Sequence, residues 1–361
     1  MKTKKITILT IIIVIIGLIS VYSSSHIWAL YKYDDALYYF KRQMIFAVLG
    51  FIAMFVTSRI DYHLYKKYYK FILIICFLLL ILVLIPGLGV VRGGSRSWFN
   101  FGVFALQPSE LFKIGIIIFS AVYMEKHYYR MKKIRYSLPV LLMMGLGFLL
   151  IMLQPDFGSG VVMACSVIVM MIVSPFPFRY FVGLGILGVI GIVIMILSAP
   201  YRMERILSFL NPFQDPLGSG FQAIQALYAI GPGGLLGVGF DKSIQKHFYL
   251  PEPQTDFIFA IIAEEFGFIG GIIVIELYTS LFKTVLKVSQ NAPDLFGSFL
   301  MIGIISMIGI QTLINLGVVV GLFPVTGVTL PLMSYGGTSL VITLMSIGIL
   351  INISKSCHDV L

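Results

Sequence analysis

The stretch ITILTIIIVIIGLISVYSSS, residues 6–25, carries no charged residue and follows three lysines within the first five positions. A helix of about 20 residues spans a hydrocarbon core of roughly 30 Å. The stretch is longer than the apolar part of a typical secretory signal, and its serine-rich end is a poor cleavage site. We therefore interpret it as an uncleaved first transmembrane span.

Nine further runs of comparable length follow it. They cover residues 43–58, 70–90, 109–125, 136–154, 158–175, 179–199, 256–282, 296–320 and 336–354. Hydrophobic residues make up 58% of the 361-residue chain and charged residues 12%, whereas soluble chains are about 25% charged. The sequence predicts an all-α polytopic integral membrane protein with about ten transmembrane helices in a single membrane domain, residues 1–361.

Lysine and arginine set the expected orientation, because short cytoplasmic segments retain them. With the N-terminus inside, most basic residues fall on inner segments, so we expect both termini in the cytoplasm. The net charge of +10 is spread over short clusters, which indicates membrane orientation and no nucleic acid partner. Three cysteines and five scattered histidines give no disulfide framework and no metal-ligand spacing, so no metal ligands are assigned.

The outer segment from about 200 to 255 is the longest connection, and long loops without their own structure are usually functional. We expect a short interfacial helix over residues 221–230. The glycine-rich residues 231–239 lack the preceding strand of a phosphate-binding loop, so we expect a flexible loop there. No internal repeat is visible by eye, which weakens the case for a transporter built from duplicated halves.

Asp256 is the first candidate catalytic residue, because it lies where the long loop enters the eighth span. A carboxylate at that boundary is partly desolvated, and desolvation raises its pKa toward the range that a general base requires. Aspartate is also favoured at helix N-termini, so Asp256 fits a helix cap equally well. The two roles are compatible.

Glu110 and Lys113 lie three residues apart at the start of the fourth span, on one helical face. Charges inside a span are costly unless they are paired, and they are often functional. We nevertheless prefer a structural ion pair that fixes two helices. Glu264, Glu265 and Glu276 in the eighth span allow the same two interpretations.

Several basic residues outside the membrane form a third group of candidates. Guanidinium and ammonium groups at a membrane surface can hold a lipid diphosphate, whose charge needs several donors. Contact with ordinary headgroups is commoner for any single residue, but their grouping on the outer side favours a bound anion. The candidates are Arg96 with its neighbour Trp98, Arg202, Arg205, Lys242 and Lys246.

The connection over residues 321–339 has no charged residue and contains many helix breakers. Non-helical backbone at membrane depth is tolerated only where it is buried in protein or lines a cavity. A re-entrant segment lining a lipid-accessible groove and an ordinary buried loop fit this composition about equally.

Five segments resemble those of the SEDS proteins (shape, elongation, division and sporulation) and recur in order along nearly the whole chain. They are GSRSW at 94–98, QPSE at 107–110, QPDFG at 154–158, YLPEPQTDFIFA at 249–260 and PLMSYGG at 331–337. The long outer loop is more similar to the FtsW and SpoVE branch than to RodA. One departure is Thr326, where some FtsW relatives have a lysine, so no role of that lysine is carried over.

The resemblance implies a peptidoglycan glycosyltransferase of the bacterial cytoplasmic membrane that polymerises lipid II on the outer face. Asp256 matches the family's essential acidic residue, Glu110 and Lys113 match its fourth-span pair, and Arg96 and Trp98 match its first outer-loop motif. We expect Asp256 to deprotonate the C4 hydroxyl of an acceptor sugar. That oxygen attacks C1 of the donor and expels undecaprenyl diphosphate with inversion, and the outer cations or a divalent cation, Mg²⁺ or Mn²⁺, stabilise the leaving group.

The implied partner is a class B penicillin-binding transpeptidase, alongside other membrane proteins of division, elongation or sporulation. Two alternatives to the enzyme are a flippase that moves lipid II without polymerising it and a non-catalytic scaffold for division proteins. The enzyme is favoured because a carboxylate and several cations group on the outer face, whereas a transporter needs polar residues along its path.

Overall fold

The computed structural model describes residues 2–92, 94–102, 104–197 and 200–357, and within them a helix occupies each predicted span. These helices are α1 (Lys2–Tyr33), α2 (Tyr38–Thr57), α3 (His63–Leu82), α4 (Pro108–Lys126), α5 (Ile134–Leu153), α6 (Phe157–Val173), α7 (Arg179–Leu197), α10 (Ile258–Ser289), α11 (Leu295–Val319) and α12 (Gly337–Ser356). Six helices of the described residues are long and apolar enough to cross a membrane: α1, α2, α5, α10, α11 and α12. The predicted polytopic all-α fold is confirmed.

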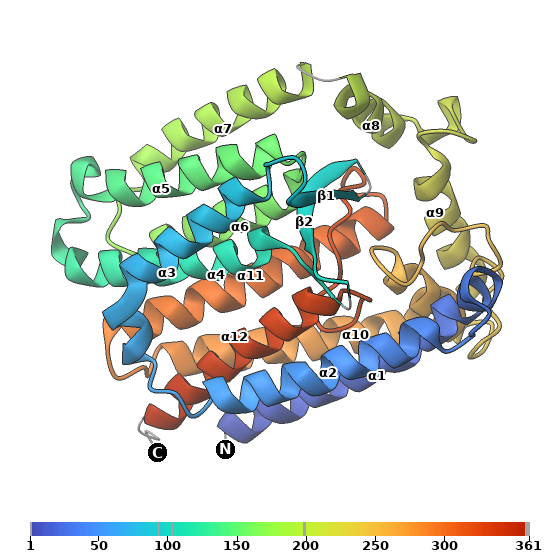
Figure 1. Ribbon diagram of the computed structural model, residues 1–361, viewed down its shortest axis with the longest axis horizontal. Helices are drawn as coiled ribbons and strands as arrows, with labels where there is room; N and C mark the ends of the chain where they lie inside the picture. Colours follow the sequence, from blue (N-terminus) through green and yellow to red (C-terminus); the bar gives the residue numbers. More distant parts are fainter. Residues whose placement is uncertain (1, 93, 103, 198–199, 358–361) are drawn as a thin grey trace.

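The helices run side by side, and α4, α11 and α12 lie in the interior of the bundle (Figure 1). In contrast, α7 lies along one edge, and most of its described side chains are exposed. Large apolar side chains on the outer helices, such as Leu149 and Phe71, stay exposed. This pattern suits a bundle whose solvent is lipid, because lipid does not drive apolar side chains inward as water does.

Both ends of the chain lie at the same end of the bundle (Figure 1). The hydroxyls of Thr3 on α1 and Ser354 on α12 are hydrogen-bonded at 2.7 Å. The opposite end carries a small sheet and the connection between α7 and α10. An even number of spans places both termini at the same end, because each span reverses the direction of the chain.

A three-stranded antiparallel sheet follows α3 and was not expected. It contains β1 (Gly89–Arg92), β2 (Ser95–Asn100) and β3 (Ala105–Leu106), in the order β1-β2-β3. The third predicted span, 70–90, therefore ends too late. Its apolar run continues past the helix, which stops at Leu82 ahead of Pro86, because a proline ring removes a backbone donor and clashes with the preceding turn.

The long connection is partly helical. It contains α8 (Pro200–Leu210), a 3-10 turn (Pro212–Gln214) and α9 (Phe221–Gly233). The helix predicted over residues 221–230 is confirmed as α9, whereas α8 was not predicted. After α9 the chain has no regular structure until it enters α10.

Of the glycine-rich residues 231–239, the first three end α9, and the rest are bonded to a break in α10. At Gly267 the backbone of α10 has φ 65° and ψ −162°, which only glycine adopts readily. The amides of Val238 and Gly239 donate to the carbonyls of Glu264 and Glu265, at 3.0 Å each. The loop thus provides the hydrogen bonds that the broken helix cannot form within itself.

Candidate active site

Asp256 lies just before α10, in the turn that ends the long connection. It does not cap the helix: the cap residue is Phe257, and no side chain caps that end. Its Oδ1 instead accepts a hydrogen bond from the Thr255 hydroxyl at 2.9 Å. The cap alternative is therefore wrong, because the carboxylate is turned toward its own neighbour rather than toward the first free amides of α10.

The surroundings of Asp256 favour its protonated form more than water does. Burial raises the pKa of the carboxyl to about 6, against the lowering effects of the Thr255 hydrogen bond and the Arg205 charge. The nearby charge of Glu252 raises the pKa further. A carboxylate with a pKa near neutrality is partly ionised and still basic enough to accept a proton, as a general base requires.

Arg205 connects α8 with the uncharged connection between α11 and α12. Its Nη1 donates to the carbonyl of Val325 at 3.3 Å, and its guanidinium is otherwise exposed. Because its charge also lowers the pKa of Asp256, Arg205 is a cation electrostatically coupled to this carboxylate. An exposed cation within electrostatic range of a candidate base could meet a substrate anion there.

The other predicted cations have different surroundings. Lys242 is exposed on the loop after α9, and Arg96 is partly buried on β2. Trp98, on the same strand, is partly buried and has interactions with other residues. The side chain of Arg202 lies outside the described part of the structure.

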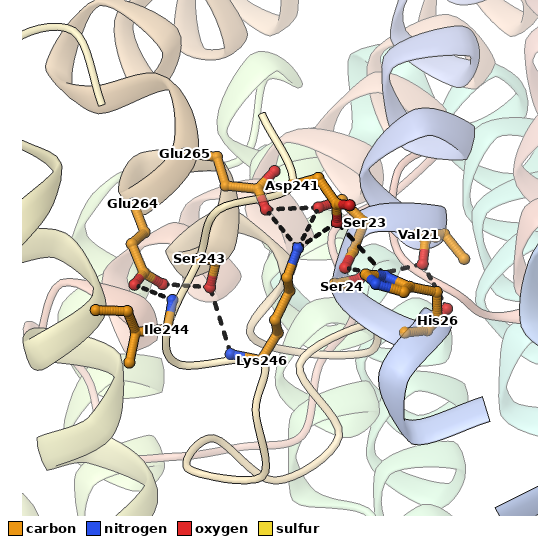
Figure 2. Close-up of polar contacts among 11 residues, drawn as sticks. Val21, Ser23, Ser24, His26, Asp241, Ser243, Ile244, Lys246, Glu264 and Glu265 are labelled. Atoms are coloured by element: carbon orange, nitrogen blue, oxygen red, sulfur yellow. Dashed lines mark hydrogen bonds and ion pairs between the residues drawn. The ribbon is translucent and has the colours of Figure 1, made fainter. Parts of the chain in front are cut away.

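Lys246 does not face an open surface, which corrects the expectation that it is available to a diphosphate. Its side chain is 1% exposed, and its ammonium lies 3.2 Å from Glu265 Oε1 on α10 and also bonds Asp241 and the Ser23 hydroxyl of α1 (Figure 2). The charge of Lys246 is thus balanced inside the protein. This ion pair fastens the loop between α9 and α10 to both α1 and α10.

The two adjacent glutamates of α10 also have structural partners. Ser243 Oγ donates to Glu264 at 2.5 Å and the Ile244 amide donates at 2.7 Å, so Glu264 holds the loop beside Lys246 (Figure 2). Ser23 donates to Glu265 at 2.5 Å. Glu265 thus pairs with another helix, α1, as the structural interpretation expected, whereas the partners of Glu264 lie on the loop before α10.

Glu110 and Lys113 form a buried ion pair in α4, with a distance of 2.8 Å between Oε1 and Nζ. Lys113 Nζ also donates to Gln311 Oε1 of α11 at 3.0 Å, and Ser339 Oγ of α12 donates to Glu110 Oε2 at 3.3 Å. The pair therefore joins three helices, one more than the preferred structural interpretation expected.

Two amides on α11 complete the polar surroundings of Asp256. Asn315 Nδ2 donates to the carbonyl of Asp256 at 2.7 Å and to that of Val328 at 2.8 Å. One turn earlier, Gln311 Nε2 donates to the carbonyl of Thr329 at 3.1 Å. Neither residue is among the sequence-based candidates, although two amides four residues apart within an apolar span are a signal that could have found them.

The connection between α11 and α12 is non-helical, exposed where it leaves α11 and buried in its second half. Residues 330–334 are buried, and Gln43 of α2 donates to the Ser334 carbonyl at 2.9 Å. The Tyr335 amide donates to the carbonyl of Gln254, two residues before Asp256, at 2.8 Å. This segment therefore forms one wall of the surroundings of Asp256, and a lipid-accessible groove along it stays a prediction.

No group of three or more histidine, cysteine or acidic residues in the described part of the chain could hold a metal ion. The divalent cation stays a prediction.

Comparison with known sequences agrees with this architecture. A family model for FtsW, RodA and SpoVE, described as "Cell cycle protein", matches residues 3–359. Stage V sporulation protein E of Bacillus subtilis (strain 168) is 51% identical, covering 98% of this chain and 99% of its own. The probable peptidoglycan glycosyltransferase FtsW of Geobacter sp. (strain M18) is 38% identical, covering 97% of this chain and 95% of its own.

Two solved structures have the same fold. A chain from a study of the structural coordination of polymerization and crosslinking by a peptidoglycan synthase complex has a TM-score of 0.81 and 31% identity, with 98% of each chain covered. The crystal structure of Thermus thermophilus rod shape determining protein RodA has a TM-score of 0.72 and 27% identity, covering 98% of this chain and 97% of that one. From end to end, this chain belongs to the FtsW/RodA/SpoVE family, the SEDS proteins.

Proposed function

We propose that this protein is a peptidoglycan glycosyltransferase that polymerises lipid II into glycan strands and releases undecaprenyl diphosphate. The observation that carries this proposal is Asp256, a partly buried carboxyl with a pKa of about 6, electrostatically coupled to the exposed Arg205. A base and a cation together suit a reaction in which a hydroxyl loses its proton while a diphosphate departs. Relatives named as peptidoglycan glycosyltransferases support the same activity.

In the proposed step, Asp256 takes the proton from the C4 hydroxyl of the acceptor sugar. The oxygen forms a bond to C1 of the donor's N-acetylmuramyl unit while the bond from C1 to the diphosphate oxygen breaks. The diphosphate leaves with that electron pair, and a single displacement inverts the anomeric configuration. The base accelerates the step because the attacking oxygen gains negative character as its proton leaves.

The departing diphosphate needs positive charge, and electrostatic stabilisation of developing charge is usually a large catalytic term. Arg205 and Lys242 are the exposed cations that we propose for this role, with Arg96 and Arg202 as further candidates. Lys246 is omitted because its charge is balanced by buried carboxylates. A divalent cation, Mg²⁺ or Mn²⁺, carried mainly by the substrate phosphates would add to the same stabilisation.

We further propose that both termini face the cytoplasm and that Asp256 acts on the outer side. The excess of lysine and arginine on the segments that share a side with the N-terminus supports this orientation. The common position of the two termini in the bundle is consistent with it.

A class B penicillin-binding transpeptidase is the proposed partner, because a structural relative comes from a peptidoglycan synthase complex that couples polymerization to crosslinking. Other membrane proteins of division, elongation or sporulation are proposed to join the same assembly. Coupling has a chemical reason: a newly made glycan strand becomes part of the wall only when its peptides are crosslinked.

Polymerisation by the purified protein tests the proposal. Wild-type protein with lipid II, alone and with a class B transpeptidase, is expected to yield glycan, whereas Asp256→Asn is expected to yield none. Glycan made by Asp256→Asn would contradict the base assignment. Translocation of labelled lipid II across liposomes by a protein that makes no glycan would instead favour the flippase.

A further inference from the structure

We infer that Asn315 is a positioning residue for Asp256, fixing the backbone that carries the catalytic carboxylate; this inference rests on the proposed function. Asn315 is 1% exposed within α11. Its Nδ2 donates to the carbonyl of Asp256 at 2.7 Å and to that of Val328 at 2.8 Å. Both acceptors belong to segments without regular structure. One amide therefore fastens the turn that carries Asp256, here called the catalytic turn, to the connection between α11 and α12.

The other end of the amide argues against a role in stability alone. Asn315 Oδ1 is buried and has no hydrogen-bond partner among the described residues, and a buried acceptor without a donor is unfavourable. Rotating the amide would not help, because Oδ1 would then face two carbonyl oxygens. A side chain that stays in such a position at a cost to the fold is expected at functional sites.

The same face of α11 links the catalytic turn to the buried charges of α4. Gln311 lies one helical turn before Asn315, donates to the carbonyl of Thr329 at 3.1 Å and accepts from Lys113 at 3.0 Å. Thr329 follows Val328 directly. The ion pair of Glu110 and Lys113 is therefore connected to the segments around Asp256 through the side-chain amides of Gln311 and Asn315. Because the ion pair is buried, it holds this face of α11 in place.

Orientation matters here because proton transfer needs the base within about 2.6–3.2 Å of the hydroxyl oxygen. A displacement of about 1 Å can reduce the rate about 100-fold. Asp256 lies on a turn before α10 rather than within a helix, and the Thr255 contact at 2.9 Å is with its immediate neighbour. The contact from α11 therefore ties the Asp256 backbone to a helix that is distant from it in the sequence.

The test uses the purified full-length protein and lipid II, comparing Asn315→Leu with Thr312→Val. Thr312 is buried on the same helix, but among the described residues its hydroxyl donates only to the Ile308 carbonyl within that helix. We expect Asn315→Leu to lower kcat at least 10-fold per folded molecule, with KM for lipid II within 3-fold. We expect Thr312→Val to leave both constants within 3-fold of wild type.

Loss of the amide also removes the donor from two carbonyls, so the thermal midpoint of each variant is measured beside its kinetics. If Asn315→Leu does not fold, Asn315→Ala, which also removes the donor, takes the same test with the same thresholds. A kcat within 3-fold of wild type overturns the inference. The inference is also overturned if Thr312→Val loses as much activity as Asn315→Leu, or if the unfolded fraction of Asn315→Leu accounts for its loss.

Failure of this inference is distinguishable from failure of the proposed function. If Asp256→Asn is inactive while Asn315→Leu retains full kcat, only the positioning role is lost. If Asp256→Asn makes glycan, the assignment of the base itself is contradicted.

Discussion

Lys113 Nζ lies 2.8 Å from Glu110 Oε1, and both side chains are enclosed where α4, α11 and α12 meet. Two opposite charges out of water stabilise each other only as a pair, because each alone carries a large desolvation cost. The pair therefore acts as a polar junction of three helices. The contribution of this pair to stability therefore depends on both residues being present.

Lys113→Met is expected to destabilise the protein by about 3–5 kcal/mol, because it leaves the Glu110 carboxylate buried and uncompensated. The double change Lys113→Met with Glu110→Gln removes both charges and is expected to recover a substantial part of that loss. Thermal unfolding in one detergent, or denaturant unfolding with the same probe, measures the difference. Equal stability of the single and double variants would contradict the paired interpretation.

Polymerisation is expected to depend on pH through Asp256. The base acts when deprotonated, so the rate should rise as pH increases through about 6 and level off above it. Arg205→Ala removes a charge that lowers this pKa, which should move the midpoint to higher pH. Rate profiles between pH 5 and pH 9 with saturating lipid II measure both midpoints. A midpoint that Arg205→Ala moves to lower pH would contradict the electrostatic coupling.

Asp256→Asn is expected to be more stable than wild type at high pH while losing activity. Burial raises the pKa of this carboxyl above its ordinary value of 3.8 to about 6, so the wild-type fold loses stability as pH rises between those values. An amide does not ionise, so the advantage of Asp256→Asn in Tm should grow over that range and then stay constant. Tm is measured at pH 5 and at pH 8. If the Tm advantage of Asp256→Asn over wild type shrinks as pH rises, burial does not disfavour the ionised Asp256 carboxylate.

Much of this fold is predictable from local sequence, but the partners of single charges are not. Apolar runs located the helices, yet the run at 70–90 could not show that the chain leaves α3 at Leu82 and forms a strand, since both structures accept apolar residues. Lys246 appeared available as an outer cation. Its partners, Ser23 and Glu265, are brought to it by the packing of α1 and α10, which local composition does not reveal.

Lys242 and Lys246 should therefore respond in opposite ways to the same change. Lys246→Met leaves Glu265 and Asp241 without their cation, so we expect a lower Tm and faster protease cleavage within residues 240–250. Lys242→Met alters an exposed side chain, so we expect an unchanged Tm and, if Lys242 meets the diphosphate, a higher KM for lipid II. Limited proteolysis, unfolding and kinetics separate the two. Similar Tm losses in both variants would contradict this distinction.

The break in α10 gives the sharpest stability test, because it depends on one backbone conformation. Gly267 has φ 65° and ψ −162°, and a Cβ there would meet the backbone of Leu235 and Gly237. Gly267→Ala is expected to cost at least about 1–3 kcal/mol from backbone strain alone, and to release the loop that α10 binds. The control is Gly145→Ala in α5, where an added Cβ has no atom within 4 Å and where alanine favours the helix. Gly145→Ala should keep or slightly raise Tm, and an equally stable Gly267→Ala would mean that the break does not require glycine.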